Sequence, residues 1–221
     1  MHAGLCPACG IAYEKWQERR SSKDDCKDAA DEESIGEVYD GSEQVDPLTF
    51  WGRVFIWCAL AAWTFYFIRH GVDWEIIGGS FLHAVNLAFH EFGHVVFAPF
   101  GHFMMILGGS LFQVLLPLAL LCVFLFYQRD RFGAAVMLWW CGQNFVDVAP
   151  YIRDAIYRSL PLVGGGGEES HDWGNLLTML HVVDRAPRYG DISFTIGACL
   201  MCAALVWAVL ILRQQYLALK N

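Results

Sequence analysis

The sequence has few charged residues and no long basic tract. Asp, Glu, Lys and Arg make up 17% of its 221 residues, whereas hydrophobic residues make up 56%. Soluble domains carry about a quarter charged residues, so this composition is not that of an ordinary soluble protein. Proteins that bind nucleic acid need a basic patch or stripe, and we therefore expect no nucleic-acid partner.

The sequence also lacks the cysteine framework of a secreted domain and an opening signal peptide. Most of its eight cysteines lie inside apolar runs, where cysteine behaves as a small hydrophobic residue. These are Cys58, Cys122, Cys141, Cys199 and Cys202. No charged segment followed by an apolar one opens the sequence. We therefore expect the N-terminus to lie in the reducing cytosol.

Three zones follow one another along the chain. Residues 1–17 contain the pair Cys6 and Cys9. Residues 18–47 are polar and acidic and cannot bury enough apolar surface to offset chain entropy, so we interpret them as a flexible linker. Residues 48–221 are dominated by long apolar runs, and we predict that they form an all-α membrane domain.

Five stretches of the third zone are long and apolar enough to cross a bilayer, which requires about 20 such residues. Backbone groups in lipid must be satisfied within the segment, which favours helices. We predict transmembrane helices at residues 51–68, 76–100, 104–127, 132–150 and 192–212. The Lys and Arg residues near their ends favour a cytosolic N-terminus and a C-terminus on the other side. The chain is thus expected to be a multi-pass integral membrane protein with the lipid bilayer as a partner.

The second stretch carries the motif His90-Glu91-Phe92-Gly93-His94. Two histidines four positions apart lie on one face of a helix, so both imidazoles can bind one Zn²⁺ ion. Glu91 can reach a zinc-activated water and act as its general base. Ionisable residues are costly inside a bilayer and usually mark a functional site there. The motif therefore predicts a zinc site, while two histidines packed for structure alone would give the same pattern.

Other polar residues lie near this motif. His83 and Asn86 extend the polar face of the same helix. We interpret Asn86 as a residue that orients a ligand, and His83 as one that supports the metal or faces a substrate. A hydrogen bond from His83 to a neighbouring helix would explain that residue equally well. Gln113 follows two small residues on the third stretch and could present its amide to a bound peptide.

Zinc needs a third protein ligand, and the end of the fourth stretch offers two aspartates. One helical face there carries Asn144, Asp147, Tyr151 and Asp154. Depth in the bilayer favours Asp147, because Asp154 lies about two turns further along a regular helix. A bend at Pro150 would turn Asp154 inward. The alternative for Asp154 is an ion pair with a nearby arginine.

His171 and Asp172 follow a run of four glycines and form another candidate pair. This His-Asp step could fold back onto the motif and supply a ligand or a supporting carboxylate. Equally, Asp172 could cap a short helix that begins at residue 173. We keep His171 as a candidate metal ligand, and Tyr151, Asn144 and Asp172 as residues that support the site or contact substrate.

Cys6 and Cys9 provide half of a tetrahedral zinc site. The string from Cys6 to Lys15 resembles the second knuckle of small bacterial zinc ribbons, but the sequence contains no first knuckle. We therefore treat residues 1–17 as a partial zinc-ribbon-like knuckle and as a weaker, second metal site.

The combination of HExxH on a membrane helix with a later helix ending in Asn-x-x-Asp-x-x-Pro-Tyr-x-x-Asp resembles the site-2 protease family of intramembrane zinc metalloproteases. The resemblance covers residues 76–155. It implies His90 and His94 as zinc ligands, Glu91 as the base, and Asp154 or Asp147 as the third ligand. In that family the asparagine precedes a proline and then Asp-Gly, an order that favours Asp154.

These observations lead to one main hypothesis and two alternatives. We expect an intramembrane metalloprotease of the bacterial inner membrane, with Glu91 activating a zinc-bound water to hydrolyse a membrane-protein or peptide substrate. The first alternative is a non-catalytic metal-binding protein, a structural or partner-binding module. Its metal would have four protein ligands, for example His90, His94, Asp147 and His171. The second is a di-iron oxidase, which the lack of another i, i+4 histidine pair disfavours.

Overall fold

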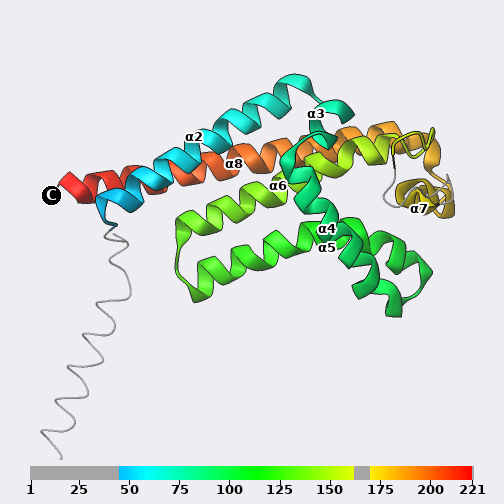
Figure 1. The fold of residues 1–221 in the computed structure, drawn as a ribbon, viewed down its shortest axis with the longest axis horizontal. Helices are drawn as coiled ribbons and strands as arrows, with labels where there is room; N and C mark the ends of the chain where they lie inside the picture. Colours follow the sequence, from blue (N-terminus) through cyan, green and yellow to red (C-terminus); the bar gives the residue numbers. More distant parts are fainter. Residues whose placement is uncertain (1–44, 162–169, 221) are drawn as a thin grey trace, which may run out of the picture. The chain divides into compact units, whose positions relative to one another are not determined.

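The computed structural model describes residues 45–161 and 170–220, and every regular element in these ranges is a helix (Figure 1). The prediction of an all-α fold is therefore confirmed for this part of the chain. The predicted knuckle with Cys6 and Cys9, and almost all of the acidic linker, lie outside the described residues. The chain divides into the units Met1–Gln44 and Val45–Asn221, and the fold below is that of the second unit.

The first long helix, α2 (Pro47–His70), begins at an aspartate and ends at a glycine. Asp46 Oδ1 accepts hydrogen bonds from the backbone N–H groups of Leu48 and Thr49 at 3.0 and 3.1 Å. These bonds satisfy donors that the first helical turn leaves unpaired. Gly71 has a φ of +68°, a left-handed conformation that favours glycine and stops the helix.

Two short helices, α3 (Trp74–Gly78) and α4 (Phe81–Phe97), occupy the stretch for which one span was predicted. Ser80 Oγ accepts a hydrogen bond from the backbone N–H of Leu82 and thereby begins a separate helix. The 17 residues of α4 extend for about 26 Å, less than the ~30 Å of a bilayer core. The chain then turns back through a 3₁₀ turn, η2 (Ala98–Phe100), and Gly101.

The remaining helices form a layer in which α6 (Arg131–Arg153) lies between α5 (His102–Cys122) and α8 (Ala186–Lys220) (Figure 1). A π-helical turn, η3 (Val123–Tyr127), extends α5, and a 3₁₀ turn, η6 (Val183–Arg185), precedes α8. The short helix α7 (Asp172–Met179) packs against α5 and α6. A Cβ atom on Gly142 would lie 2.8 Å from the carbonyl oxygen of Gly197, so glycine lets α6 and α8 approach closely.

Three helical segments of the described chain are long and apolar enough to cross a membrane, namely Pro47–His70, His102–Tyr127 and Val183–Lys220. They contain three of the predicted spans, but the predicted number of about five is not confirmed. Ser80 divides the second predicted span. The fourth lies in α6, where the buried residues Gln143, Asn144 and Asp147 reduce the apolar character.

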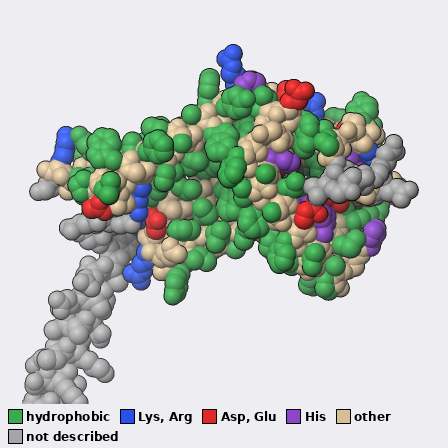
Figure 2. Space-filling model, in the orientation of Figure 1, with side chains coloured by type: hydrophobic (Ala, Val, Ile, Leu, Met, Phe, Trp, Pro, Cys, Tyr) green, Lys and Arg blue, Asp and Glu red, His purple; other side chains and the backbone are tan. Residues whose placement is uncertain are grey.

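The outer surface of the helices is apolar over most of the face seen in Figure 2. On α2, the side chains of Trp51, Phe55 and Phe65 are 64%, 74% and 66% exposed. A soluble protein rarely exposes a contiguous apolar surface of this kind, whereas lipid favours it. The surface is therefore consistent with a membrane protein.

Both ends of this membrane domain lie at the same end of the helix bundle. Phe50 of α2 stacks on Tyr216 of α8, with ring centroids 6.0 Å apart. At this end Arg53 also forms an ion pair with Asp130, which caps α6, at 3.1 Å. The short helix α7 lies towards the opposite end (Figure 1). The predicted five crossings would separate these two ends, and the side of the membrane on which each end lies stays a prediction.

Candidate metal centre

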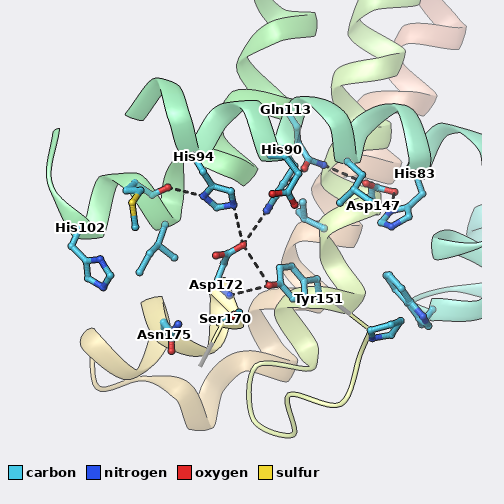
Figure 3. Close-up of a pocket in the computed structure, with 17 residues that line it drawn as sticks. His83, His90, His94, His102, Gln113, Asp147, Tyr151, Ser170, Asp172 and Asn175 are labelled. Atoms are coloured by element: carbon cyan, nitrogen blue, oxygen red, sulfur yellow. Dashed lines mark hydrogen bonds and ion pairs between the residues drawn. The ribbon is translucent and has the colours of Figure 1, made fainter. Parts of the chain in front are cut away.

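Three side chains from two helices converge at one point, His90 and His94 from α4 and Asp172 from α7. Asp172 Oδ2 lies 3.0 Å from His90 Nε2 and 3.3 Å from His94 Nε2 (Figure 3). All three ligand atoms lie within 4.8 Å of one another. Tetrahedral zinc ligands, each about 2.0–2.2 Å from the metal, are about 3.3 Å apart. The two distances from Asp172 Oδ2 suit ligands of one zinc ion, and they equally suit direct hydrogen bonds between the side chains.

Glycines on α5 create the space that the two imidazoles fill. The helices α4 and α5 run antiparallel, and a Cβ on Gly93 would clash with the carbonyl of Gly108. A Cβ on Gly109 would lie 2.6 Å from the Nε2 atoms of both His90 and His94. Only glycine at position 109 allows both rings to keep these positions.

Hydrogen bonds fix the tautomers of both imidazoles. His90 Nδ1 lies 3.0 Å from Gln113 Oε1, and His94 Nδ1 lies 2.8 Å from the Met105 carbonyl oxygen. Both oxygens only accept, so in the neutral rings each Nδ1 carries the proton and each Nε2 carries a lone pair. These lone pairs face Asp172 Oδ2, which is itself an acceptor. Three acceptors at this spacing require a positive charge, either a metal ion between them or protons on the imidazoles.

Asp172 is also held from α6. The hydroxyl of Tyr151 accepts a hydrogen bond from the backbone N–H of Asp172 at 2.9 Å, and it donates to Asp172 Oδ2 at 3.4 Å. Burial opposes ionisation of Asp172, but when His90 and His94 are protonated and donate to it, these hydrogen bonds outweigh burial and lower its pKa to about 2. The side chain is therefore a carboxylate at physiological pH, the form that binds metals.

The short helix α7 is fixed to α5 and α6 by polar and apolar contacts. Trp173 Nε1 donates a hydrogen bond to Ser110 Oγ of α5 at 3.0 Å. On the apolar side, Leu177 is 3% exposed and packs in one cluster with Val148 and Ile152 of α6. These contacts hold the first residue of α7, Asp172, over the two histidines.

Asp154 and His171 form a separate pair next to the site. Asp154 accepts hydrogen bonds from the backbone N–H and the hydroxyl of Ser159, both at 2.7 Å, and from the N–H of Leu160 at 2.9 Å. His171 Nδ1 accepts the N–H of Gly174 at 3.0 Å, so its Nε2 carries the proton and donates to Asp154 Oδ2 at 3.3 Å. Burial lowers the pKa of His171, which favours the neutral ring. The structure thus brings these two together, but away from the histidine pair of α4.

Asp147 lies one side chain away from the converging group. Its Oδ1 lies 3.1 Å from His83 Nδ1, and its Oδ2 accepts a hydrogen bond from Gln113 Nε2 at 3.3 Å. Because Gln113 contacts His90 in turn, these residues form a chain from His83 to the candidate metal ligand. Figure 3 shows this chain on one side of Asp172.

The two predicted asparagines form hydrogen bonds with residues of α6 rather than with the converging group. Asn86 is fully buried, donates to Gln143 Oε1 at 2.7 Å and accepts from Trp140 Nε1 at 2.9 Å. Asn144 donates to the backbone carbonyl of Trp140 at 2.9 Å. Among the described residues, neither lines the cavity beside the histidines.

A cavity of about 560 Å³ opens beside the converging group. Glu91 borders it together with His90, His94 and Asp172. Much of the remaining wall is apolar and includes Leu87, Met105 and Ile106. Three protein ligands would leave a fourth metal position, and the cavity offers room there for water and a substrate.

The sequence analysis did not predict that Gly109 makes room for the two imidazoles or that the Met105 carbonyl contacts His94. The pairing of Gly93 in the motif with Gly108 and Gly109 on the next helix was an available signal, since small residues mark close helix contacts. The contact of Met105 had no such signal, because every residue carries a backbone carbonyl.

Comparison of the chain with protein-family models, with curated proteins and with solved structures finds no match. The resemblance to site-2 proteases stays a prediction from sequence motifs. Any function must therefore be argued from the chain's own residues, foremost His90, His94, Glu91 and Asp172.

Proposed function

We propose that the chain is a membrane-embedded zinc metallopeptidase in which His90, His94 and Asp172 bind the metal. The observation that carries this proposal is the convergence of two imidazole Nε2 atoms and one carboxylate oxygen beside a cavity. Two imidazoles and a carboxylate are a donor set that zinc prefers. Catalytic zinc sites use three protein ligands and keep one position open.

The surrounding residues can carry out peptide hydrolysis. Zinc at this site would act as a Lewis acid and lower the pKa of water. Glu91, on the cavity wall, accepts the proton of the water that attacks the peptide carbonyl carbon and delivers it to the nitrogen of the breaking C–N bond. Tyr151 also lines the cavity, and its hydroxyl would exchange its hydrogen bond to Asp172 Oδ2 for one to the carbonyl oxygen as negative charge develops there.

We also infer that α2, α5, α6 and α8 cross the bilayer, whereas α4 does not. The helix α6 packs along α8, so the lipid that surrounds one surrounds the other. Phe50 lies against Tyr216, which requires an even number of crossings between them. With a cytosolic N-terminus, α8 also ends in the cytosol, and the metal centre lies towards the opposite face.

The distribution of positive charge supports this orientation. Ten Lys and Arg residues either precede α2 in the sequence or lie at the end of the bundle where α2 begins: Lys15, Arg19, Arg20, Lys23, Lys27, Arg53, Arg129, Arg131, Arg213 and Lys220. Five lie towards the other end: Arg69, Arg153, Arg158, Arg185 and Arg188. Cytosolic segments are the ones enriched in Lys and Arg. In a bacterial inner membrane, the metal centre would then face the periplasmic side.

Substitution of the proposed base tests the catalytic part of this function. The parent protein carries Cys6→Ser and Cys9→Ser, so that the N-terminal thiols bind no zinc. We expect Glu91→Gln to retain the zinc of the parent but to lose at least ~100-fold in hydrolysis, because a positioned base contributes that much or more. Zinc is measured by plasma mass spectrometry, and hydrolysis by mass spectrometry of a set of synthetic transmembrane peptides.

His90→Ala is the matched control and should lose both zinc and hydrolysis. Undiminished hydrolysis by Glu91→Gln would remove the mechanism. A parent that holds zinc and cleaves none of the peptides would instead favour the non-catalytic metal-binding alternative. A parent that holds no more zinc than His90→Ala would remove the metal site itself.

A further inference from the structure

Asp147 is a buried carboxylate that the proposed reaction does not use. It is 4% exposed and lies on α6, between His83 and Gln113. A buried charge in a membrane domain is costly unless it is paired and hydrogen-bonded, and such residues tend to be functional. Only the side chain of Gln113 separates Asp147 from His90, and this position indicates what the function of Asp147 is.

The amide of Gln113 lies between a carboxylate and an imidazole. A carboxylate only accepts hydrogen bonds, so the NH₂ group of Gln113 must face Asp147. Its carbonyl oxygen must then face His90 Nδ1. This acceptor places the proton of His90 on Nδ1 and keeps the Nε2 lone pair directed at Asp172.

The orientation of Gln113 therefore decides whether His90 can bind a metal. If the amide rotated by half a turn, its NH₂ group would face Nδ1, and the proton of His90 would move to Nε2. No lone pair would then point at the metal position. His94 has no such alternative, because its Nδ1 faces the backbone carbonyl of Met105, which only accepts.

We propose that Asp147 is a positioning residue that acts through Gln113 to fix the tautomer of His90 and so to set the zinc affinity of the site. His83 occupies the other carboxylate oxygen and restrains its rotation. This inference rests on the proposed zinc site, and it gives Asp147 an indirect role in place of direct ligation.

The isosteric variant Asp147→Asn tests this role. An asparagine keeps the size of the side chain but can donate as well as accept, so it no longer dictates the orientation of Gln113. We expect the affinity for Zn²⁺ to fall about 10–100-fold, as when an outer partner of a metal-binding histidine is lost. The affinity is measured by competition with a chromophoric chelator, on the full chain with Cys6→Ser and Cys9→Ser.

The double variant Gln113→Glu/Asp147→Asn reverses the donor and acceptor at the two positions. The carboxylate introduced at position 113 accepts from His90 Nδ1, and the amide introduced at position 147 donates to that carboxylate. We expect the double variant to recover most of the affinity that Asp147→Asn loses. If the two substitutions acted only by disturbing the structure, their losses of zinc affinity would instead add.

Ser193→Ala is the control for loss of a buried hydrogen bond. Ser193 Oγ donates to the Phe145 carbonyl of α6 at 2.8 Å and does not touch the chain of residues at His90. Its zinc affinity should equal that of the parent. Unchanged affinity in Asp147→Asn, or a double variant that binds zinc no more tightly than Asp147→Asn, overturns the inference while the zinc site stands. A parent without zinc at His90 overturns both.

Discussion

The residues that compete as third metal ligand differ in what their polar atoms already contact. Asp154 accepts three hydrogen bonds from Ser159 and Leu160 and one from His171, and both nitrogens of His171 are engaged. Asp172 instead shares one oxygen between two imidazoles that have no other contact at Nε2 among the described residues. Asp172 lies beside the Nε2 lone pairs of His90 and His94 and is therefore the proposed ligand. Asp154 lies beside no such lone pairs and is a structural carboxylate.

This difference predicts opposite effects of two identical substitutions. Asp172→Asn replaces the carboxylate by a neutral amide, a much weaker zinc ligand, and we expect zinc affinity to fall by more than about 100-fold, beyond the loss for an outer partner. Asp154→Asn leaves the ligands in place but weakens a buried network, so unfolding should cost about 1–3 kcal/mol less. Chelator competition and denaturant unfolding in detergent micelles measure the two quantities. An equal loss of zinc in both variants would contradict the assignment.

At this scale the sequence predicts the histidine pair and Glu91, because their spacing within one helix is local information. Asp172 was expected to support the site, to contact substrate or to cap a short helix, but α7 begins at Asp172 and is capped by His171. The place of Asp172 depends on how α7 docks against α5 and α6, and that docking is a property of the tertiary fold. The same holds for Gln113, whose amide was expected to meet a peptide and instead lies against His90.

At the scale of helices, the approach of α4 to α5 depends on glycines that leave room for the imidazoles. We predict that Gly109→Ala abolishes zinc binding, since its Cβ would lie 2.6 Å from both Nε2 atoms. Helix propensity favours alanine over glycine by about 0.5–1 kcal/mol, so the helix itself should persist. Zinc content and circular dichroism of the purified protein measure the two effects.

Gly52→Ala is the matched control, because a Cβ there has no atom within 4 Å. It should keep the zinc content and helicity of the parent. Full zinc binding in Gly109→Ala would show that the α4–α5 contact can adjust, against the steric argument.

Hydropathy located α2, α5 and α8, since long apolar runs need no knowledge of neighbours. It did not find the break at Ser80, because hydropathy averaged over a span does not register the turn signal Gly78-Gly79-Ser80, which ends α3 and caps α4. It also did not show that α6 is the central helix, where buried polar residues such as Gln143 contact other helices instead of lipid.

At the scale of the whole unit 45–221, the pairing of Phe50 with Tyr216 places the start of α2 and the end of α8 together, away from the proposed metal centre (Figure 1). We predict that green fluorescent protein fused after residue 221 fluoresces, because it remains in the cytosol. Alkaline phosphatase inserted at Gly165 should be active, because the described residues before and after it, the end of α6 and the start of α7, would lie towards the other face of the membrane.

Fusing each reporter at the other position gives the reciprocal control, and both signals should then be lost. Active phosphatase at the C-terminus together with fluorescence at Gly165 would reverse the orientation and place the metal centre on the cytosolic side. Phosphatase activity at both positions would contradict the even number of crossings.

The origin of the third ligand in α7 has a consequence for the newly synthesised protein. Ribosomes make the histidine pair of α4 long before Asp172, and α7 packs in a cluster with Ala186 and Tyr189 at the start of α8, the last helix to emerge. A nascent chain would therefore enter the membrane before the proposed centre is complete. If the chain hydrolyses peptides as we propose, hydrolysis would begin only after α8 is in place, and neighbouring unfolded chains would be spared.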